Sequence, residues 1–235
     1  MIKKTLNQNA KYVHKLIDII ESDFVFNKEP INRFTKVKID TDNSLKDKNE
    51  QLLNLKRRIN SIENCNLKKN SKNLVLGEGD LNSKIMLIGE APGEIEDSLG
   101  LSFQGEIGSL LNKMLLAINI DRNKVYTTYS VNFRPPGDRK PTNQEIKRYS
   151  IFLKDHISII NPKIVICMGS TAMHAITGLN NKISDERGKW KEIILKNKSL
   201  PLMITFSPSY LMRFPEYKKY SWEDLKKIKH KIQEL

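Results

Sequence analysis

Short apolar runs alternate with longer amphipathic segments along most of the chain. Apolar runs bounded by turn residues predict buried strands, and apolar positions repeating at helical spacing predict helices. Strands are expected at Leu74–Leu76, Lys84–Ile88, Val125–Val131, Lys163–Met168 and Leu202–Phe206. Helices are expected over 105–119, 143–160, 170–177 and 221–234. This alternation predicts the α/β class: a three-layer α/β/α domain around a central, mostly parallel sheet of four principal strands.

The N-terminal part of the chain has a different pattern. Residues 9–22 carry apolar side chains at helical spacing, which predicts a short amphipathic helix. The polar, charged run Asp40–Glu50 is interpreted as extension or linker, and Gln51–Asn64 resumes a helical pattern. We therefore expect an N-terminal extension over residues 1–50 and a single domain over residues 51–235, a length that can bury a substantial core.

Composition adds a basic charge and few cysteines. The chain has 40 Lys and Arg against 27 Asp and Glu, a formal net charge of +13, which favours a nucleic-acid partner over a membrane. Lys, Ile and Asn are used heavily throughout, so genome base composition is an alternative source of part of this excess. Cys65 and Cys167 lie far apart, which predicts neither a disulfide framework nor a zinc site. The sequence has no apolar stretch near ~20 residues and no signal-peptide pattern, so a cytoplasmic protein is expected. We also expect a monomer.

Residues 85–105, IMLIGEAPGEIEDSLGLSFQG, are the most informative stretch. An apolar run ends in the tight turn Gly89–Gly93, and Glu94, Glu96 and Asp97 follow. A strand, a glycine-proline turn and convergent carboxylates together indicate an active-site rim at the carboxyl end of a parallel strand. Pro-Gly turns and acidic loops are also common on surfaces, and carboxylates here can simply favour a helix N-terminus.

Two later segments add candidate phosphate-binding chemistry. In RPPGDRKP, residues 134–141, prolines stiffen a cationic loop that can meet a phosphate chain with little ordering cost. In SPSYLMR, residues 207–213, serine and proline cap a helix whose free amides can bind phosphate. A plain helix cap explains Ser207 and Pro208 but not the whole string. The segment around Trp190 is interpreted as a turn, with that side chain packed on the core.

Taken in order, GEAPGEIED, GLSFQGEIGSLL, RPPGDRKPT and SPSYLMR resemble family 4 of the uracil-DNA glycosylases, a bacterial and archaeal branch, over about residues 52–234. The resemblance implies the fold of those enzymes and a hydrolase that extrudes a nucleotide from DNA. It would cleave the N-glycosidic bond of uracil and so initiate base excision repair.

The resemblance also implies roles for single residues. Glu90 would orient water and counter the positive charge that develops on the sugar, Ser207 would assist departure of the base, and Phe103 would stack on a pyrimidine. An ordinary core aromatic is the alternative for Phe103. Backbone groups of the turn would contact the base or a flanking phosphate: Ala91, Pro92 and Gly93. Leu211 would push into the base stack as an apolar wedge. The implied DNA contacts are Arg134, Arg139, Lys140, Ser209, Leu211 and Arg213.

Several positions depart from the family pattern. The enzymes of this family bind a four-iron cluster through four cysteines, and the corresponding positions here are Ile62, Cys65, Phe133 and Tyr149. One thiolate cannot hold such a cluster. We therefore predict that no iron–sulfur cluster and no other cofactor or metal is bound, and that these four residues form a small apolar core instead.

Three substitutions affect the chemistry. Ser207 replaces a histidine and is a weaker hydrogen-bond donor, and losing such a donor costs about 10²–10³ in rate in comparable sites. Tyr129 replaces the asparagine that reads uracil, and Asp138 replaces another asparagine. A catalytically weak or inactive DNA-binding protein is accordingly the alternative to an active glycosylase. A nucleotide- or phosphate-binding enzyme unrelated to DNA is a third hypothesis. No lysine nucleophile is expected among the pocket motifs.

Overall fold

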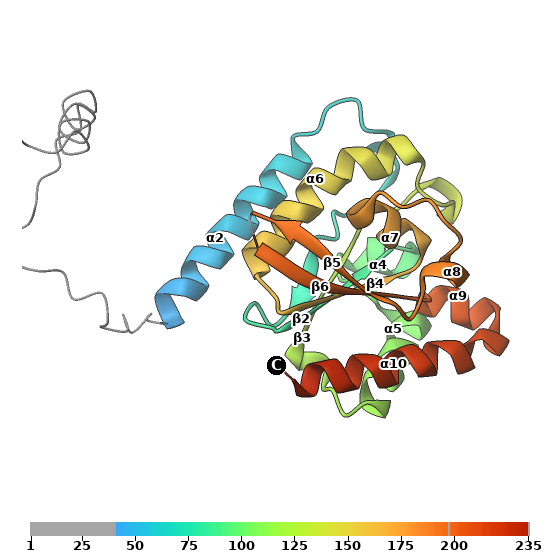
Figure 1. Ribbon diagram of the computed structural model, residues 1–235. Coiled ribbons are helices and arrows are strands. Elements are labelled where there is room, and N and C mark those ends of the chain that lie inside the picture. Colours follow the sequence, from blue (N-terminus) through green and yellow to red (C-terminus); the bar gives the residue numbers. More distant parts are fainter. Residues whose placement is uncertain (1–40, 197, 235) are drawn as a thin grey trace, which may run out of the picture. The chain divides into compact units, whose positions relative to one another are not determined.

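The computed structural model describes residues 41–196 and 198–234, and its centre is a mixed sheet (Figure 1). The strands are β1 Gly77–Gly79, β2 Ile85–Gly89, β3 Val125–Tyr129, β4 Ile164–Met168, β5 Trp190–Leu195 and β6 Lys198–Thr205. Their order is β1-β3-β2-β4-β6-β5. The four inner strands are parallel, whereas β1 and β5 pair antiparallel at the two edges. The predicted parallel sheet of four principal strands is confirmed, and two edge strands extend it.

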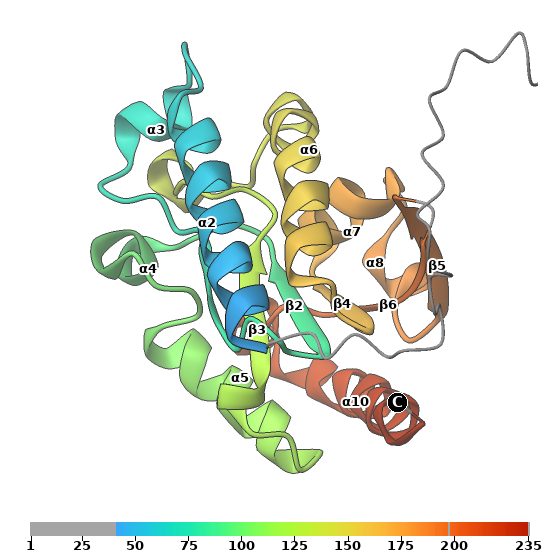
Figure 2. The same ribbon diagram turned by 90° about the vertical axis from the view of Figure 1, so that its left-hand side faces the viewer.

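Helices cover both faces of this sheet. They are α2 Thr41–Asn60, α3 Asn66–Asn70, α4 Glu94–Leu99, α5 Gly105–Ala117, α6 Asn143–Ile160, α7 Ser170–Thr177, α8 Ile183–Glu186, α9 Pro208–Arg213 and α10 Lys218–Gln233. Figure 2 shows α2 and α6 on one side of the sheet and α5 and α10 on the other. The helices predicted at 105–119, 143–160, 170–177 and 221–234 are confirmed, with small shifts at their ends. No helix of the described chain is long and apolar enough to cross a bilayer.

The alternation of side chains along the inner strands builds two cores. In β2, Ile85 and Leu87 belong to the cluster under α5 and α10, whereas Met86 and Ile88 belong to the cluster under α6 and α7. Every residue of β2 is buried. Because both faces are covered, the strand reads as a continuous apolar run rather than an alternating one.

The first described helix crosses residue 50, where the extension was expected to meet the domain. The run interpreted as linker is helical from Thr41 onward. Lys48 fixes this part, because its ammonium donates to the carbonyls of Leu81 and Ile160 at 2.8 and 3.1 Å. A polar segment can therefore be ordered without burying apolar side chains of its own. The helix predicted over 9–22 lies outside the described residues.

Both edge strands differ from the expectation. The strand predicted at Leu74–Leu76 starts later, at Gly77, although Val75 already donates its amide to the Asn132 carbonyl at 2.9 Å. β5 was not predicted, and Trp190 opens that strand instead of lying in a turn, while it does pack against the core. The reason is that β5 lies at an edge and alternates half-buried with exposed positions, so its apolar signal is weak.

Candidate active site

The strand order places a crevice between β2 and β4. From β2 the chain passes to β3 through α5 on one face, and from β3 it crosses to β4 and β6 through α6 and α7 on the other face. The connections after β2 and β4 therefore diverge, which opens a crevice at the carboxyl ends of these strands. Glu90 directly follows β2, and Ser170 follows β4 after one glycine.

The Glu90 carboxylate is the centre of this crevice, and three donors hold it. Its Oε1 accepts hydrogen bonds from the Thr171 amide at 3.1 Å and the Ser170 hydroxyl at 3.3 Å. Its Oε2 accepts one from the Ser207 hydroxyl at 3.2 Å. The first turn of α7 favours a negative charge here. The Gly89 turn and the SPSYLMR segment thus meet in one crevice, as the roles implied for Glu90 and Ser207 require. We call Glu90 and its three donor residues the Glu90 centre: Glu90, Ser170, Thr171 and Ser207.

The α7 side of the Glu90 centre was missed by sequence reasoning. Gly169 has a φ of +107°, and a Cβ there would lie 2.4 Å from the carboxyl carbon of Glu90, so only glycine allows this approach. The available signal was the Gly-Ser step, which follows a buried strand and opens a helix as Gly89-Glu90 does.

Ser207 caps α9 and serves the carboxylate at the same time. Its Oγ accepts the Tyr210 amide at 3.3 Å, which confirms the predicted N-cap, and lies 3.0 Å from the Ser209 hydroxyl. Its own proton is donated to Glu90. In this conformation Ser207 therefore positions Glu90, rather than presenting its proton to a leaving base.

The predicted stacking residue is covered by another ring. Phe103 and Tyr129 stack with centroids 4.9 Å apart and planes 24° apart, and the Phe103 amide donates to the Tyr129 hydroxyl at 3.0 Å. Both rings lie against Gly89, where a Cβ would come within 2.7 Å of each. Phe103 and Tyr129 are only 5% and 4% exposed. In this conformation the Tyr129 ring covers Phe103, so a pyrimidine can stack on Phe103 only after that ring has moved. Burial also raises the pKa of Tyr129, which keeps its phenol neutral.

The acidic residues after the turn hold structure. Glu96 is buried, and its carboxylate accepts the amides of Gly93 and Gln104, each at 3.1 Å. Asp97, also buried, accepts the amides of Lys72 at 2.9 Å and Asn73 at 3.1 Å. The Gly93 amide expected to meet a ligand is therefore already bonded.

The next two turn residues mainly pack. Pro92 is buried, and Ala91 packs against the cluster that contains Cys65. In this conformation the two residues pack against the protein, and neither is placed to contact a base. Glu90 is thus the member of the turn whose functional group faces the crevice.

Two arginines of the proline loop are paired with carboxylates. Arg134 makes two hydrogen bonds to Asp138, at 2.7 and 2.8 Å, and this pairing lowers the pKa of the Asp138 carboxyl. Arg139 pairs in the same way with Glu145, at 2.8 and 2.7 Å. Lys140 differs, because its ammonium lies 3.4 Å from the Ser170 hydroxyl. Lys140, which the resemblance implies as a DNA contact, thus borders the Glu90 centre.

Leu211 does not present an apolar wedge. It is 1% exposed and belongs to the main core, because α9 packs against α5 on this face. Met212 is 37% exposed and Arg213 is exposed as well. The wedge prediction is therefore wrong in this conformation: the residue one turn after Ser207 faces inward, and its successors face outward.

The four positions of the expected cluster replacement pack together, as predicted. Cys65, Phe133 and Tyr149 are buried in one cluster, and half-buried Ile62 packs against it. The Cys65 sulfur lies 3.2 Å from the Tyr149 hydroxyl, and the Phe133 and Tyr149 rings meet edge to face at 6.4 Å. We call this the Cys65 core. One thiol among three bulky side chains does not fit a four-iron cluster.

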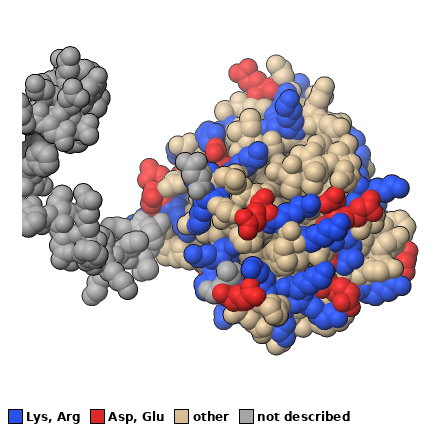
Figure 3. All heavy atoms as spheres, in the orientation of Figure 1, with Lys and Arg blue, Asp and Glu red and all other residues tan. Residues whose placement is uncertain are grey.

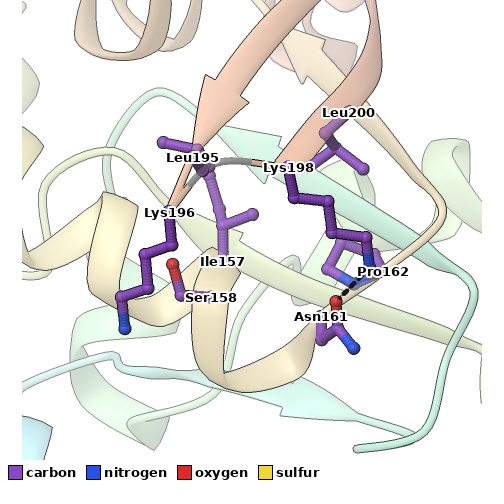
Figure 4. Close-up of a pocket in the computed structure, with 8 residues that line it drawn as sticks. All are labelled: Ile157, Ser158, Asn161, Pro162, Leu195, Lys196, Lys198 and Leu200. Carbon is purple, nitrogen blue, oxygen red and sulfur yellow. Dashed lines mark hydrogen bonds between the residues drawn. The ribbon is translucent and has the colours of Figure 1, made fainter. Parts of the chain in front are cut away.

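Other candidate sites are few in the described chain. Within it, no three His, Cys, Asp or Glu side chains converge in a way that could hold a metal ion. A shallow pocket lies between the end of α6 and the β5–β6 hairpin (Figure 4). It is lined by Ile157, Ser158, Asn161, Pro162, Leu195, Lys196, Lys198 and Leu200. This pocket lies where β6 begins, at the amino ends of the parallel strands, whereas the Glu90 centre lies at their carboxyl ends.

Comparison with known proteins gives consistent matches. A model of the Uracil DNA glycosylase superfamily matches residues 76–226. The type-4 uracil-DNA glycosylase of Thermotoga maritima is 36% identical over 184 residues, covering 77% of this chain and 94% of its own length. The type-4 enzyme of Archaeoglobus fulgidus is 33% identical over 183 residues, 76% of this chain and 92% of its own. That of Sulfurisphaera tokodaii is 36% identical over 188 residues, 77% of this chain and 84% of its own.

Proposed function

Because the chain belongs to the type-4 branch of the uracil-DNA glycosylase superfamily, we propose that it hydrolyses the N-glycosidic bond of uracil in DNA and thereby initiates base excision repair. The observation that carries this proposal is the Glu90 centre. Three strand ends, far apart in sequence, supply a carboxylate and its donors to one crevice. The proposal includes base flipping by a monomer in a bacterial cytoplasm.

The reaction needs a group that stabilises positive charge beside the sugar. As the bond between C1′ and the base nitrogen breaks, the base leaves with the electron pair, and water then bonds to C1′ and gives up a proton. Glu90 lies fixed by three hydrogen bonds, so its negative charge needs no reorganisation when the sugar becomes cationic. The same carboxylate can orient the water.

Neighbouring residues complete the proposed site. Ser207 holds Glu90 in the free protein and donates a hydrogen bond from its hydroxyl to the departing base once the nucleotide has entered. Lys140, 3.4 Å from Ser170, contacts a phosphate beside the extruded nucleotide, and exposed Arg213 contacts another. Because Arg134 pairs with Asp138 in the loop and Arg139 pairs with Glu145 in α6, we assign their side chains to shaping the loop rather than to binding DNA.

The base must displace Tyr129 before it can stack on Phe103. Breaking the ring contact and the bond to the Phe103 amide opposes entry of the nucleotide, so we propose slow excision. We also propose that the protein functions without a cluster, because the Cys65 core fills the corresponding volume with side chains. No step of the reaction requires a redox group.

The covered Phe103 ring favours a second candidate, a DNA-binding protein that excises poorly or not at all. The same single observation, the Phe103–Tyr129 stack, supports it. Such a protein would retain its affinity for uracil-containing DNA and release no base.

One assay separates the two candidates. Oligonucleotides bearing uracil, hypoxanthine or xanthine are incubated with the wild type, Glu90→Ala and Glu94→Ala, and abasic sites are detected by alkaline cleavage. Glu94 is the matched control, because its side chain is 74% exposed beside the same turn. We expect excision of uracil by the wild type and by Glu94→Ala, and loss of at least about 10²-fold in Glu90→Ala. Salt-sensitive binding without abasic sites would support the second candidate.

A further inference from the structure

We propose that an aromatic strip leading away from the Glu90 centre binds single-stranded DNA by stacking on its bases. The strip consists of five rings: Phe206, Tyr210, Phe214, Tyr217 and Tyr220. The proposal rests on the proposed function only in placing the reacting nucleotide at the Glu90 centre.

The rings form a continuous packed series. Phe206 is buried at the end of β6 and stacks on Tyr210, with centroids 5.1 Å apart and planes 11° apart. Phe214 packs on Tyr210 at 4.8 Å, and Tyr217 meets the Phe206 and Tyr210 rings edge to face at 5.3 Å. Tyr220 continues the series from Tyr217 at 6.0 Å. The inner rings thus fix the position of the outer ones, which lowers the ordering cost of binding.

The outer end of the strip is exposed. Phe214 and Tyr220 are each 42% exposed, and Met212 beside them is 37% exposed. Arg187 and Lys219 lie over the Tyr220 ring, 5.5 and 4.9 Å from its centre, so Phe214 is the main candidate for stacking on a base. Large apolar side chains that lie next to one another at the surface are typical of binding surfaces. Every nucleic-acid base has a flat face that can stack on such a ring, whatever the sequence.

The strip begins at the Glu90 centre. The Tyr210 amide donates to Ser207, which in turn donates to Glu90. At about 1.5 Å per residue along α9, Phe214 lies roughly 10 Å beyond Ser207. Nucleotides of a strand in duplex geometry are about 3.4 Å apart, so a strand whose nucleotide occupies the crevice reaches Phe214 within a few nucleotides.

Charge around the strip complements a phosphate chain. Arg213, Lys218 and Lys219 flank Phe214, against one carboxylate, Glu216. Within the described residues none of the three cations has an ion pair with an acidic side chain, and the Lys219 ammonium lies 4.9 Å from the centre of the Tyr220 ring. Figure 3 shows further Lys and Arg side chains over the lower part of the molecule, where Figure 1 places α10.

Exposed rings beside cations suit a nucleic acid better than other partners. The rings further favour a single strand over a duplex. In a duplex each base face is covered by its neighbours, so exposed rings can stack only on unpaired bases. An apolar protein partner would not require three cations that lack an ion pair within the described residues, and a duplex alone would not require the aromatic faces.

The test measures binding without chemistry. Fluorescence anisotropy follows the full-length protein binding to a labelled thymine oligonucleotide that lacks uracil, and to the same strand in a duplex. The variants are Phe214→Ala, Phe214→Trp and Trp222→Ala. Trp222 is the matched control, because it is also 42% exposed and makes no ring contact in the described chain.

We expect Phe214→Ala to weaken single-strand binding about tenfold, with a smaller change on the duplex. Phe214→Trp should retain the affinity, and Trp222→Ala should change it less than about twofold. Equal losses on both DNA forms, an equal loss in Trp222→Ala, or no loss in Phe214→Ala would overturn the proposal. Failure of uracil excision alone would leave this binding unchanged, so the two failures are distinguishable.

Discussion

The Glu90 centre and the Cys65 core are both assembled from distant parts of the chain, but their interiors are opposite. At the Glu90 centre, a half-buried carboxylate is surrounded by polar donors from α7 and α9. In the Cys65 core, one sulfur and one hydroxyl face each other among apolar side chains. The first arrangement keeps a charge ready beside a crevice, and the second excludes charge and solvent.

The contrast between these two interiors indicates where a substitution should affect chemistry and where it should affect stability. The Cys65 core packs as ordinary apolar core, so we expect substitutions in it to change stability. At the Glu90 centre, Ser207 donates a hydrogen bond to the carboxylate, so we expect substitutions there to change the rate of excision. Tyr129 lies between these cases, because it packs like a core residue yet covers the ring expected to hold the base.

The largest expected effect sharpens this contrast through Tyr149. Tyr149→Ala removes a fully buried ring and should lower the free energy of unfolding by about 3–5 kcal/mol. Urea denaturation followed by circular dichroism measures it. Tyr149→Phe is the control, since it loses only the contact with Cys65 and should cost about 1 kcal/mol. A small loss in Tyr149→Ala would mean that this region is not part of the core.

A smaller effect is expected at Tyr129. Tyr129→Asn removes the ring that covers Phe103, and single-turnover excision of uracil should rise by about tenfold, equivalent to about 1.4 kcal/mol. Tyr129→Phe keeps the ring but loses the hydrogen bond from the Phe103 amide, so its rate should lie between those of the wild type and Tyr129→Asn. If Tyr129→Asn folds normally, as judged by its circular dichroism spectrum, but excises no faster, the ring does not control entry of the base.

The sequence allowed the layers of the fold and the meeting of Glu90 with Ser207 to be predicted, because buried parallel strands read as apolar runs and both residues directly follow such strands. Side-chain direction could not be predicted in the same way. Leu211 follows Ser207 by one turn of a short helix, and only the packing of α9 on α5 turns it inward. The Phe103–Tyr129 stack joins residues from two separate segments through Gly89, which no local pattern records.

The central claim is that Glu90 serves chemistry rather than folding, and Glu90→Gln tests it most directly. The variant keeps the shape of the side chain and removes its charge. Its single-turnover rate of uracil excision and its free energy of unfolding are measured side by side with those of the wild type. We predict that the rate falls by at least about 10²-fold, while the free energy of unfolding changes by less than about 1 kcal/mol. An unchanged rate, or a large loss of stability that accounts for the lost activity, would contradict the account.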